Sequence, residues 1–231
     1  MKNLIIKIIK KCIEFALRNN NEFVARNITL ELQRRALSST VDYIQKNMSK
    51  VDSVNSSLEL LNISLDEVDI TKNGLILEFG VFSGKTINHI ASRVQQTVYG
   101  FDSFEGLPER WRDGFSTGHF QVTHLPKVRQ NVILIKGWFD QTLPSFLAEH
   151  VEPISFLHID CDLYSSTKTV FELCANRIHS GTVIVFDEYF NYDGWEDGEY
   201  KAFQEFVVAN NIRYQYLGYN RFHEQVAVVI L

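Results

Sequence analysis

Short apolar runs alternate with helical patterns over most of this chain. Seven runs have the length and composition of strands, at residues 75–79, 97–101, 132–136, 154–159, 182–186, 213–217 and 225–230. Helical periodicity lies between most of them, at residues 84–94, 142–150, 165–178 and 197–209. Near-continuous apolar strands separated by helices predict a mostly parallel α/β sheet covered on both faces. The connection between the last two strands is short enough for a hairpin, so we expect the last strand to be antiparallel.

The first 57 residues follow a different pattern. In residues 1–17, apolar residues recur at helical spacing with lysines between them, at Ile5, Ile8, Ile9, Cys12, Ile13 and Ala16. A second helical stretch covers residues 22–47, and a Ser/Asn-rich segment follows it. We therefore expect a helical N-terminal arm over residues 1–57 and one larger domain over residues 58–231.

Charge separates the same two parts of the chain. Residues 1–40 hold eight Lys/Arg and three Asp/Glu, whereas the whole chain of 231 residues has a formal net charge of −5. An acidic domain is not typical of nucleic-acid-binding proteins, so we expect no nucleic-acid partner. The lysines interrupt the apolar run near the N-terminus too often for a signal peptide or a membrane-spanning helix.

The basic amphipathic arm has two interpretations. It could lie on an anionic membrane, or it could pack on the body or on another subunit. The arm contains no Trp and no lipidation motif, which favours protein packing. We therefore expect a homo-oligomer and no membrane contact. Three cysteines without a C-x-x-C pair favour a reducing compartment, so we expect the protein to be cytoplasmic.

Ligands of open α/β sheets bind outside the carboxyl ends of the strands, so the residues after each strand form the candidate site. The first strand runs into a turn, E-F-G-V-F-S-G-K-T, that contains Gly80 and Gly84. The gap between these glycines is one residue short of a P-loop, which argues against a phosphotransferase that would use Lys85 and Thr86. Asp102 follows the second strand, and an acid there commonly accepts hydrogen bonds from ribose hydroxyls. The turn and the acid together favour a nucleoside ligand.

Three acidic residues follow the fourth and fifth strands. Asp160 comes after the fourth strand, and Asp187 and Glu188 come after the fifth. If these strands are neighbours, the carboxylates converge and repel one another unless protons, hydrogen bonds or a cation intervene. Oxygen ligands suit Mg²⁺ or Mn²⁺ better than zinc, and helix caps with salt bridges are the structural alternative. His158 stands two residues before Asp160, so both side chains point to the same face.

Two aromatic segments flank this candidate site. The connection of residues 103–131 is long and rich in aromatic residues, which predicts a lid or binding loop, and it carries His119. Trp138 follows the third strand in the segment G-W-F-D. Its ring could stack on a base or belong to the core, and the residue pattern leaves both interpretations open.

Five segments stand in a recognisable order: E-F-G-V-F-S-G-K-T, G-F-D-S-F-E-G-L-P-E, G-W-F-D-Q-T-L-P, H-I-D-C-D-L-Y-S-S-T and V-F-D-E-Y. In this order, over about residues 74–231, the chain resembles class I S-adenosylmethionine-dependent methyltransferases. More specifically, it resembles the macrocin O-methyltransferase family. The resemblance implies a Rossmann-like sheet of seven strands in a methyltransferase domain. It also implies metal-dependent transfer of a methyl group from S-adenosylmethionine to a hydroxyl of a small molecule, a sugar-bearing or other natural product.

The resemblance further implies roles for individual residues. The cofactor would contact Glu78, Gly80, Ser83, Gly84, Asp102, Ser103, Phe104, Gly137 and Trp138. Asp160, Asp187 and Glu188 would hold Mg²⁺ or Mn²⁺, which lowers the pKa of an acceptor oxygen, so Asp160 also counts as catalytic. From its position on the strand, His158 could take the proton or support the metal ligands, and His119 on the long connection is the rival base. The rival outside catalysis is a cofactor-binding scaffold that docks a partner through its basic arm.

Overall fold

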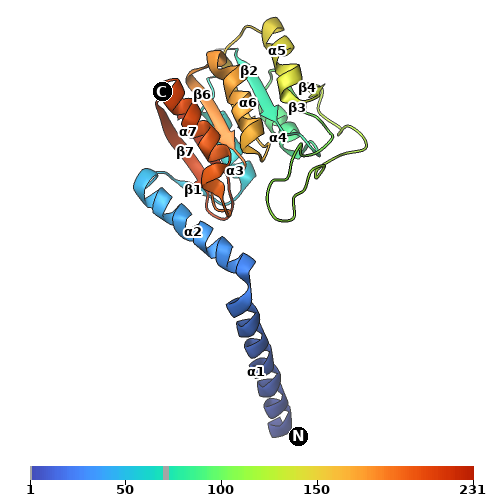
Figure 1. The fold of residues 1–231 in the computed structure, drawn as a ribbon, viewed down its shortest axis with the longest axis vertical. Coiled ribbons are helices and arrows are strands. Elements are labelled where there is room, and N and C mark those ends of the chain that lie inside the picture. The colour runs from blue at the N-terminus through green and yellow to red at the C-terminus, as the bar shows by residue number, and fades with distance from the viewer. Residues whose placement is uncertain (1, 70–72) are drawn as a thin grey trace.

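Among the residues that the structure describes, eight strands form one sheet at the centre of the protein (Figure 1). The computed structural model describes residues 2–69 and 73–231, and the side chains of all of these except residues 2–5 and 16–23. The strands are β1 Ser53–Val54, β2 Leu75–Phe79, β3 Val98–Asp102, β4 Val132–Lys136, β5 Ile154–Ile159, β6 Ile178–Phe186, β7 Tyr214–Asn220 and β8 Val226–Ile230. Their order is β1-β7-β8-β6-β5-β2-β3-β4, and β8 is antiparallel to both of its neighbours. The expected Rossmann-like sheet with an antiparallel last strand is confirmed.

Helices cover both faces of the sheet. They are α1 Lys2–Arg26, α2 Ile28–Asn47, α3 Ser57–Asp66, α4 Lys85–Arg93, α5 Phe139–Glu149, α6 Tyr164–Cys174 and α7 Glu199–Ala209, with 3₁₀ turns at Ala175–Arg177 and Trp195–Asp197. Buried residues of α5, α6 and α7 form one core cluster with the sheet, and those of α3 and α4 form a second cluster. Within the part of the chain that the structure describes, no helix is both long and apolar enough to cross a membrane.

The sheet has one strand more than the seven expected. β1 pairs in parallel with β7 at the edge of the sheet, through Ser53↔Tyr219 and Val54↔Asn220. A strand of two residues is too short to give an alternating pattern, so the sequence did not reveal it. The strand brings the last residues of the expected N-terminal arm into the sheet of the larger domain.

The two N-terminal helices differ in how they meet the body. The side chains of Ala36 and Thr40 on α2 are buried, and the Trp195 indole donates a hydrogen bond of 2.9 Å to the Ser39 hydroxyl. Helix α2 begins after Asn27, whose side chain accepts a hydrogen bond of 3.0 Å from the Leu30 backbone and caps the helix. Helix α1 lies on the other side of this cap and projects away from the body (Figure 1).

The central strands end side by side, and backbone hydrogen bonds continue past their ends. The Asp160 N–H donates to the Phe79 carbonyl at 2.8 Å, and the Asp187 N–H donates to the Ile159 carbonyl at 2.9 Å. In the same way, the Gly80 N–H donates to the Phe101 carbonyl at 2.9 Å. The residues that follow β2, β5 and β6 are therefore held about one strand spacing apart.

Candidate active site

A cavity of about 740 Å³ opens over the carboxyl ends of these strands. Its walls come from the turns after β2, β3, β4, β5 and β6, from the 103–131 connection and from the tip of the β7–β8 hairpin. Of the residues proposed from sequence, the following line the cavity: Gly80, Ser83, Asp102, Ser103, Trp138, Asp160, Asp187 and Glu188. A volume of this size accommodates a cofactor together with part of a small acceptor.

The turn after β2 requires glycine because it passes very close to the neighbouring strand. Gly80 has a φ of +93°, and a Cβ atom on it would lie 1.6 Å from the carbonyl oxygen of Asp160. Gly84, with a φ of +78°, precedes the first residue of α4. These conformations bring the backbone of the turn to the wall of the cavity, where Val81 and Phe82 also lie. The helix of nine residues that follows directs its N-terminal end toward this turn.

Asp102 fixes the shape of this turn. One carboxylate oxygen accepts hydrogen bonds from the Val81 and Phe82 N–H groups, at 2.9 and 2.8 Å. The other oxygen accepts a hydrogen bond of 2.6 Å from the Phe104 N–H. Hydrogen bonds to an ionised acceptor are roughly twice as strong as neutral ones, so this carboxylate stabilises both the glycine turn and the start of the 103–131 connection.

Glu78 and His158 form a buried pair below the floor of the cavity. They face each other on β2 and β5, and His158 Nδ1 lies 3.0 Å from Glu78 Oε2. The Thr86 hydroxyl donates a hydrogen bond of 3.1 Å to the other Glu78 oxygen. Burial raises the pKa of Glu78, although the hydrogen bond from His158 opposes this. Burial lowers the pKa of His158, but the hydrogen bond and charge of Glu78 outweigh it, so the pKa is raised.

Several residues that the resemblance assigned to the cofactor lie behind the walls. Glu78 is completely buried and does not line the cavity, and the same holds for the buried ring of Phe104. Gly84 and Gly137 shape the backbone of the walls without lining the cavity themselves. These four residues therefore support the cavity wall in this structure.

Three side chains meet where β5 and β6 end. One potential ligand atom from each of His158, Asp160 and Asp187 lies within 4.8 Å of the others. His158 Nε2 is buried and has no hydrogen-bond partner among the described residues. Burial raises the pKa of Asp160 well above its usual value, and the charge of Asp187 raises it further. An unpartnered imidazole nitrogen beside two repelling carboxylates has the chemistry of a site for a divalent cation.

The structure therefore changes the set of metal-ligating candidates. Sequence reasoning grouped Asp160 and Asp187 with Glu188 and gave His158 another role. In the structure, His158 belongs to the compact group, while Glu188 stands beside it on the cavity wall. Glu188 is buried, and its Oε2 has no hydrogen-bond partner within the described chain. Burial and the charge of Asp187 raise the pKa of Glu188 well above its usual value. A nearby cation would therefore stabilise the ionised form of this carboxyl group as well.

Two further acids of this region were not recognised from sequence. Asp162 lines the cavity with a φ of 64°, and burial, followed by the charge of Asp187, raises its pKa to about 7. Glu199, at the start of α7, is completely buried and accepts a hydrogen bond of 3.2 Å from the Glu188 N–H. The segment H-I-D-C-D contains Asp162 and could have revealed it, whereas Glu199 comes from a distant part of the chain.

The 103–131 connection is folded over the cavity and is tied to the C-terminal hairpin. Arg112 makes two parallel hydrogen bonds to Glu224, at 3.0 and 3.1 Å, and its guanidinium lies 3.9 Å from the centre of the Trp111 ring. The rings of Trp111, Phe115 and Phe120 line the cavity. The His119 ring packs against Phe115 and Phe120, and this histidine does not itself line the cavity.

Comparison with known proteins connects this geometry to a family. Residues 77–189 match the family model described as a methyltransferase domain. Among solved structures, a calicheamicin methyltransferase superposes with a TM-score of 0.59 at 22% identity, over 90% of this chain and 85% of its own. The O-methyltransferase NovP superposes with a TM-score of 0.58 at 22% identity, over 74% of this chain and 78% of its own. Residues 77–189 therefore match a methyltransferase domain, and the chain shares the fold of these methyltransferases.

The chain is also similar to two curated O-methyltransferases, in agreement with the resemblance to the macrocin O-methyltransferase family. It is 26% identical over 138 residues to demethyldecarbamoylnovobiocin O-methyltransferase of Streptomyces niveus, covering 51% of each chain. It is also 26% identical over 141 residues to 8-demethyl-8-(2,3-dimethoxy-alpha-L-rhamnosyl)-tetracenomycin-C 4'-O-methyltransferase of Streptomyces olivaceus, covering 50% of this chain and 53% of that one. The chain spans about half the length of the curated relatives it matches.

Proposed function

We propose that this chain is an O-methyltransferase that transfers a methyl group from S-adenosylmethionine to a hydroxyl of a sugar-bearing small molecule. One observation carries the proposal: a single cavity joins the glycine turn and Asp102 to the acids Asp160, Asp187 and Glu188. The first part suits a nucleoside cofactor, and the second suits a hydroxyl that must lose a proton. The domain match and the names of the two curated relatives support methyl transfer to oxygen.

In this proposal, S-adenosylmethionine lies along the ends of β2, β3 and β4. Gly80 and Ser83 border its methionine end, Asp102 and Ser103 face its ribose, and Trp138 stacks on its adenine. All five residues line the cavity, which supports this assignment. Four further residues do not contact the cofactor and instead hold the backbone of the cavity wall in place: Glu78, Gly84, Phe104 and Gly137.

His158, Asp160 and Asp187 would hold the divalent cation, Mg²⁺ or Mn²⁺, with Glu188 beside them. When bound, the cation would lower the pKa of an acceptor hydroxyl. Glu78 holds His158 at Nδ1, which leaves Nε2 as the ligand atom. The His158 side chain is only 1% exposed, so we assign it to the cation rather than to proton transfer. Asp162 lines the cavity and is the carboxylate that we assign to accept a hydrogen bond from the acceptor hydroxyl.

The acceptor would lie under the 103–131 connection. The rings of Trp111, Phe115 and Phe120 offer apolar faces to a sugar ring, and Arg112 is held beside them. A second structure of the calicheamicin enzyme is described as a TDP-rhamnose 3'-O-methyltransferase. Nucleotide-linked and aglycone-linked deoxysugars are therefore the first acceptors to test. The three cysteines are free thiols, in keeping with a cytoplasmic enzyme.

Calorimetry followed by a methyl-transfer assay tests the proposal. We expect S-adenosylhomocysteine to bind and ATP not to bind, because the turn lacks P-loop spacing. We then expect S-adenosylmethionine, Mg²⁺ or Mn²⁺ and a deoxysugar acceptor to give a product heavier by one methyl group. Binding of ATP without S-adenosylhomocysteine would favour the phosphotransferase. Binding of S-adenosylhomocysteine without transfer to any hydroxyl would favour a cofactor-binding scaffold.

A further inference from the structure

Helix α1 has two sharply separated faces. At about 100° per residue, the side chains of residues 6–15 divide into an apolar arc of about 180° and a charged arc of about 100°. The apolar arc contains Phe15, Ile8, Cys12, Ile9, Ile13 and Ile6, and the charged arc contains Lys10, Glu14, Lys7 and Lys11. Within residues 6–15, no charged residue interrupts the apolar arc. Lys10 and Lys11 stand at its two edges.

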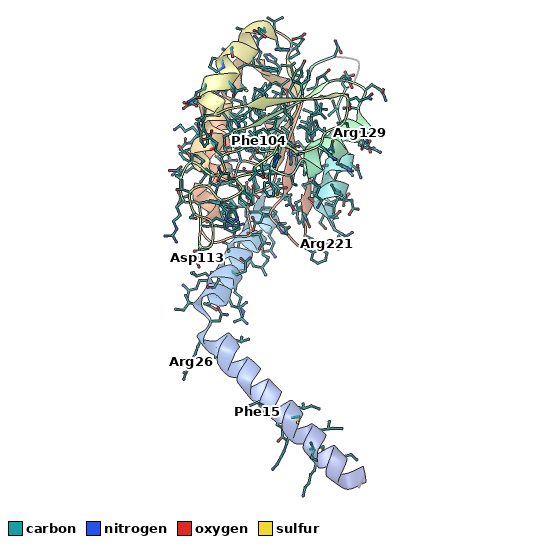
Figure 2. All side chains as sticks on the ribbon, turned by 90° about the vertical axis from the view of Figure 1, so that its right-hand side faces the viewer. Phe15, Arg26, Phe104, Asp113, Arg129 and Arg221 are labelled. Carbon is teal, nitrogen blue, oxygen red and sulfur yellow. The ribbon has the colours of Figure 1, made fainter. Side chains whose placement is uncertain are left out.

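This apolar face is in contact with water. Its isoleucines and Phe15 are between 47% and 68% exposed, and Cys12 is exposed as well. Figure 2 shows Phe15 and Arg26 on the part of α1 that lies outside the body. The expectation that this segment packs on the body is therefore not met for these residues. An apolar surface of several such side chains in a row marks an interaction site.

The width of the face distinguishes between partners. Two paired helices bury a stripe of roughly 100° or less, so one facing helix would leave both margins of this face in water. The boundary between the headgroups and the acyl chains of a bilayer is planar and covers half of a helix at once. Lysines at the edges of the apolar arc can extend their amino groups toward lipid headgroups while their stems cover apolar surface.

Charge selects the kind of bilayer. Helix α1 holds six Lys/Arg and two Glu, whereas the whole chain has a net charge of −5. The rest of the chain is therefore acidic, and an anionic surface attracts α1 while it repels the body. The break at Asn27 separates the direction of α1 from that of α2, which packs on the body (Figure 1). The body and its cavity can then remain in water while α1 lies on the surface.

We propose that α1 is an interfacial membrane helix that binds bilayers rich in anionic lipids, with Ile6, Ile8, Ile9, Ile13 and Phe15 on the lipid side. This binding does not depend on the catalytic role of the cavity.

Flotation of the full chain with vesicles tests this inference. We expect binding to phosphatidylcholine vesicles that contain phosphatidylglycerol, and much weaker binding to phosphatidylcholine alone. Ile9→Asp, near the middle of the apolar arc, should lower the partition coefficient by about tenfold or more. Val208→Asp is the matched control, because Val208 is an exposed aliphatic residue on α7. This variant should bind vesicles as well as the wild type does. Lys10→Gln and Lys11→Gln should each lower binding by about fivefold.

Cys12 provides a second readout within the natural sequence. It is exposed on the apolar arc, whereas Cys161 and Cys174 are buried, so a water-soluble maleimide should label Cys12 selectively. Anionic vesicles should slow this labelling several-fold, and neutral vesicles should not. Equal labelling rates with both vesicles, or flotation that survives Ile9→Asp, would overturn the inference. So would a stable dimer that Ile9→Asp converts to monomer, because the face would then belong to a second copy.

Discussion

At the scale of single residues, Gly80 shows how one backbone position connects the cofactor turn to the acidic end of β5. A side chain there would have to displace the Asp160 carbonyl, because its Cβ atom would lie 1.6 Å from that oxygen at a φ of +93°. We expect Gly80→Ala to lower the free energy of unfolding by about 3 kcal/mol or more, because left-handed strain and overpacking add. Urea unfolding measures the loss.

Gly114 is the matched control for this substitution. It has a similar φ of +85°, but a Cβ atom on it would have nothing within 4 Å. Gly114→Ala should therefore cost only about 1–2 kcal/mol, the strain of the left-handed conformation. If both variants lose the same free energy of unfolding, the close approach of the turn to Asp160 does not add to the cost of Gly80→Ala.

Asp102 combines a structural role with its proposed ribose contact. We expect Asp102→Ala to weaken the binding of S-adenosylhomocysteine by about 1.5–3 kcal/mol, the range for hydrogen bonds to a charged group. The variant removes the carboxylate that accepts the Val81 and Phe82 N–H groups, so the turn should loosen as well. Calorimetry measures the affinity. Asp113→Ala is the control, because it removes an exposed carboxylate from the 103–131 connection and should leave the affinity for S-adenosylhomocysteine unchanged. If both variants weaken binding equally, Asp102 has no specific role in holding the ribose.

The sequence revealed those site residues that regular strands bring to the cavity. Asp102, Asp160 and Asp187 directly follow or end strands, so topology alone brings them to one edge. The pairing of Glu78 with His158 also follows from strand register, but only once β2 and β5 are known to be neighbours. Asp162 reaches the cavity through a left-handed backbone conformation, which no periodicity predicts. Residues placed by irregular loops therefore remained outside the sequence-based site.

At the scale of elements, the ion pair of Arg112 with Glu224 ties the lid, residues 103–131, to the C-terminal hairpin. Arg112 and Glu224 are 27% and 13% exposed, so their two hydrogen bonds are only partly weakened by water. We expect Arg112→Ala to destabilise the lid locally by about 1–3 kcal/mol. Limited proteolysis by trypsin at Lys127 or Arg129 should then become about tenfold faster, or more, while the body stays folded.

Arg110 offers the control for this experiment. Its contact with Asp113 is 3.9 Å long, and both side chains are largely exposed, so Arg110→Ala should leave the stability of the lid unchanged. If trypsin cleaves Arg112→Ala at Lys127 or Arg129 no faster than it cleaves the wild type and Arg110→Ala, the ion pair does not hold the lid. Arg112→Lys should behave more like Arg112→Ala, because lysine cannot form the two parallel hydrogen bonds.

The alternation of apolar runs and helical patterns predicted most elements, whereas β1 and α3 were missed. All seven expected strands occur, with β6 beginning earlier, at Ile178. Helix α3 was missed although its start carries a capping signal: Ser56 accepts a hydrogen bond of 3.2 Å from the Glu59 N–H. The apolar face of α1 was recognised from sequence. The periodic pattern reveals this apolar face, but it does not reveal the partner outside the chain that covers it.

At the scale of the whole molecule, cation binding should couple to folding, because the proposed ligands come from two strands that the sheet must first bring together. Saturating Mg²⁺ or Mn²⁺, at about 100 times the dissociation constant, should stabilise the fold by about 2.7 kcal/mol and raise the Tm by roughly 5–10 °C. EDTA should reverse the shift and stop methyl transfer. Differential scanning calorimetry measures this without an acceptor.

Removing single ligands separates the cation from the cofactor pocket. Asp160→Asn or Asp187→Asn should abolish the thermal shift and nearly abolish methyl transfer. S-adenosylhomocysteine should still bind, because the glycine turn follows β2 and Asp102 ends β3, away from the substituted residues. Glu188→Gln should do less harm, since this side chain stands outside the compact group of His158, Asp160 and Asp187. Asp140→Asn, which changes another carboxylate of the cavity wall, should keep the full shift. Metal dependence is refuted if chelator-treated enzyme methylates a competent acceptor at the full rate.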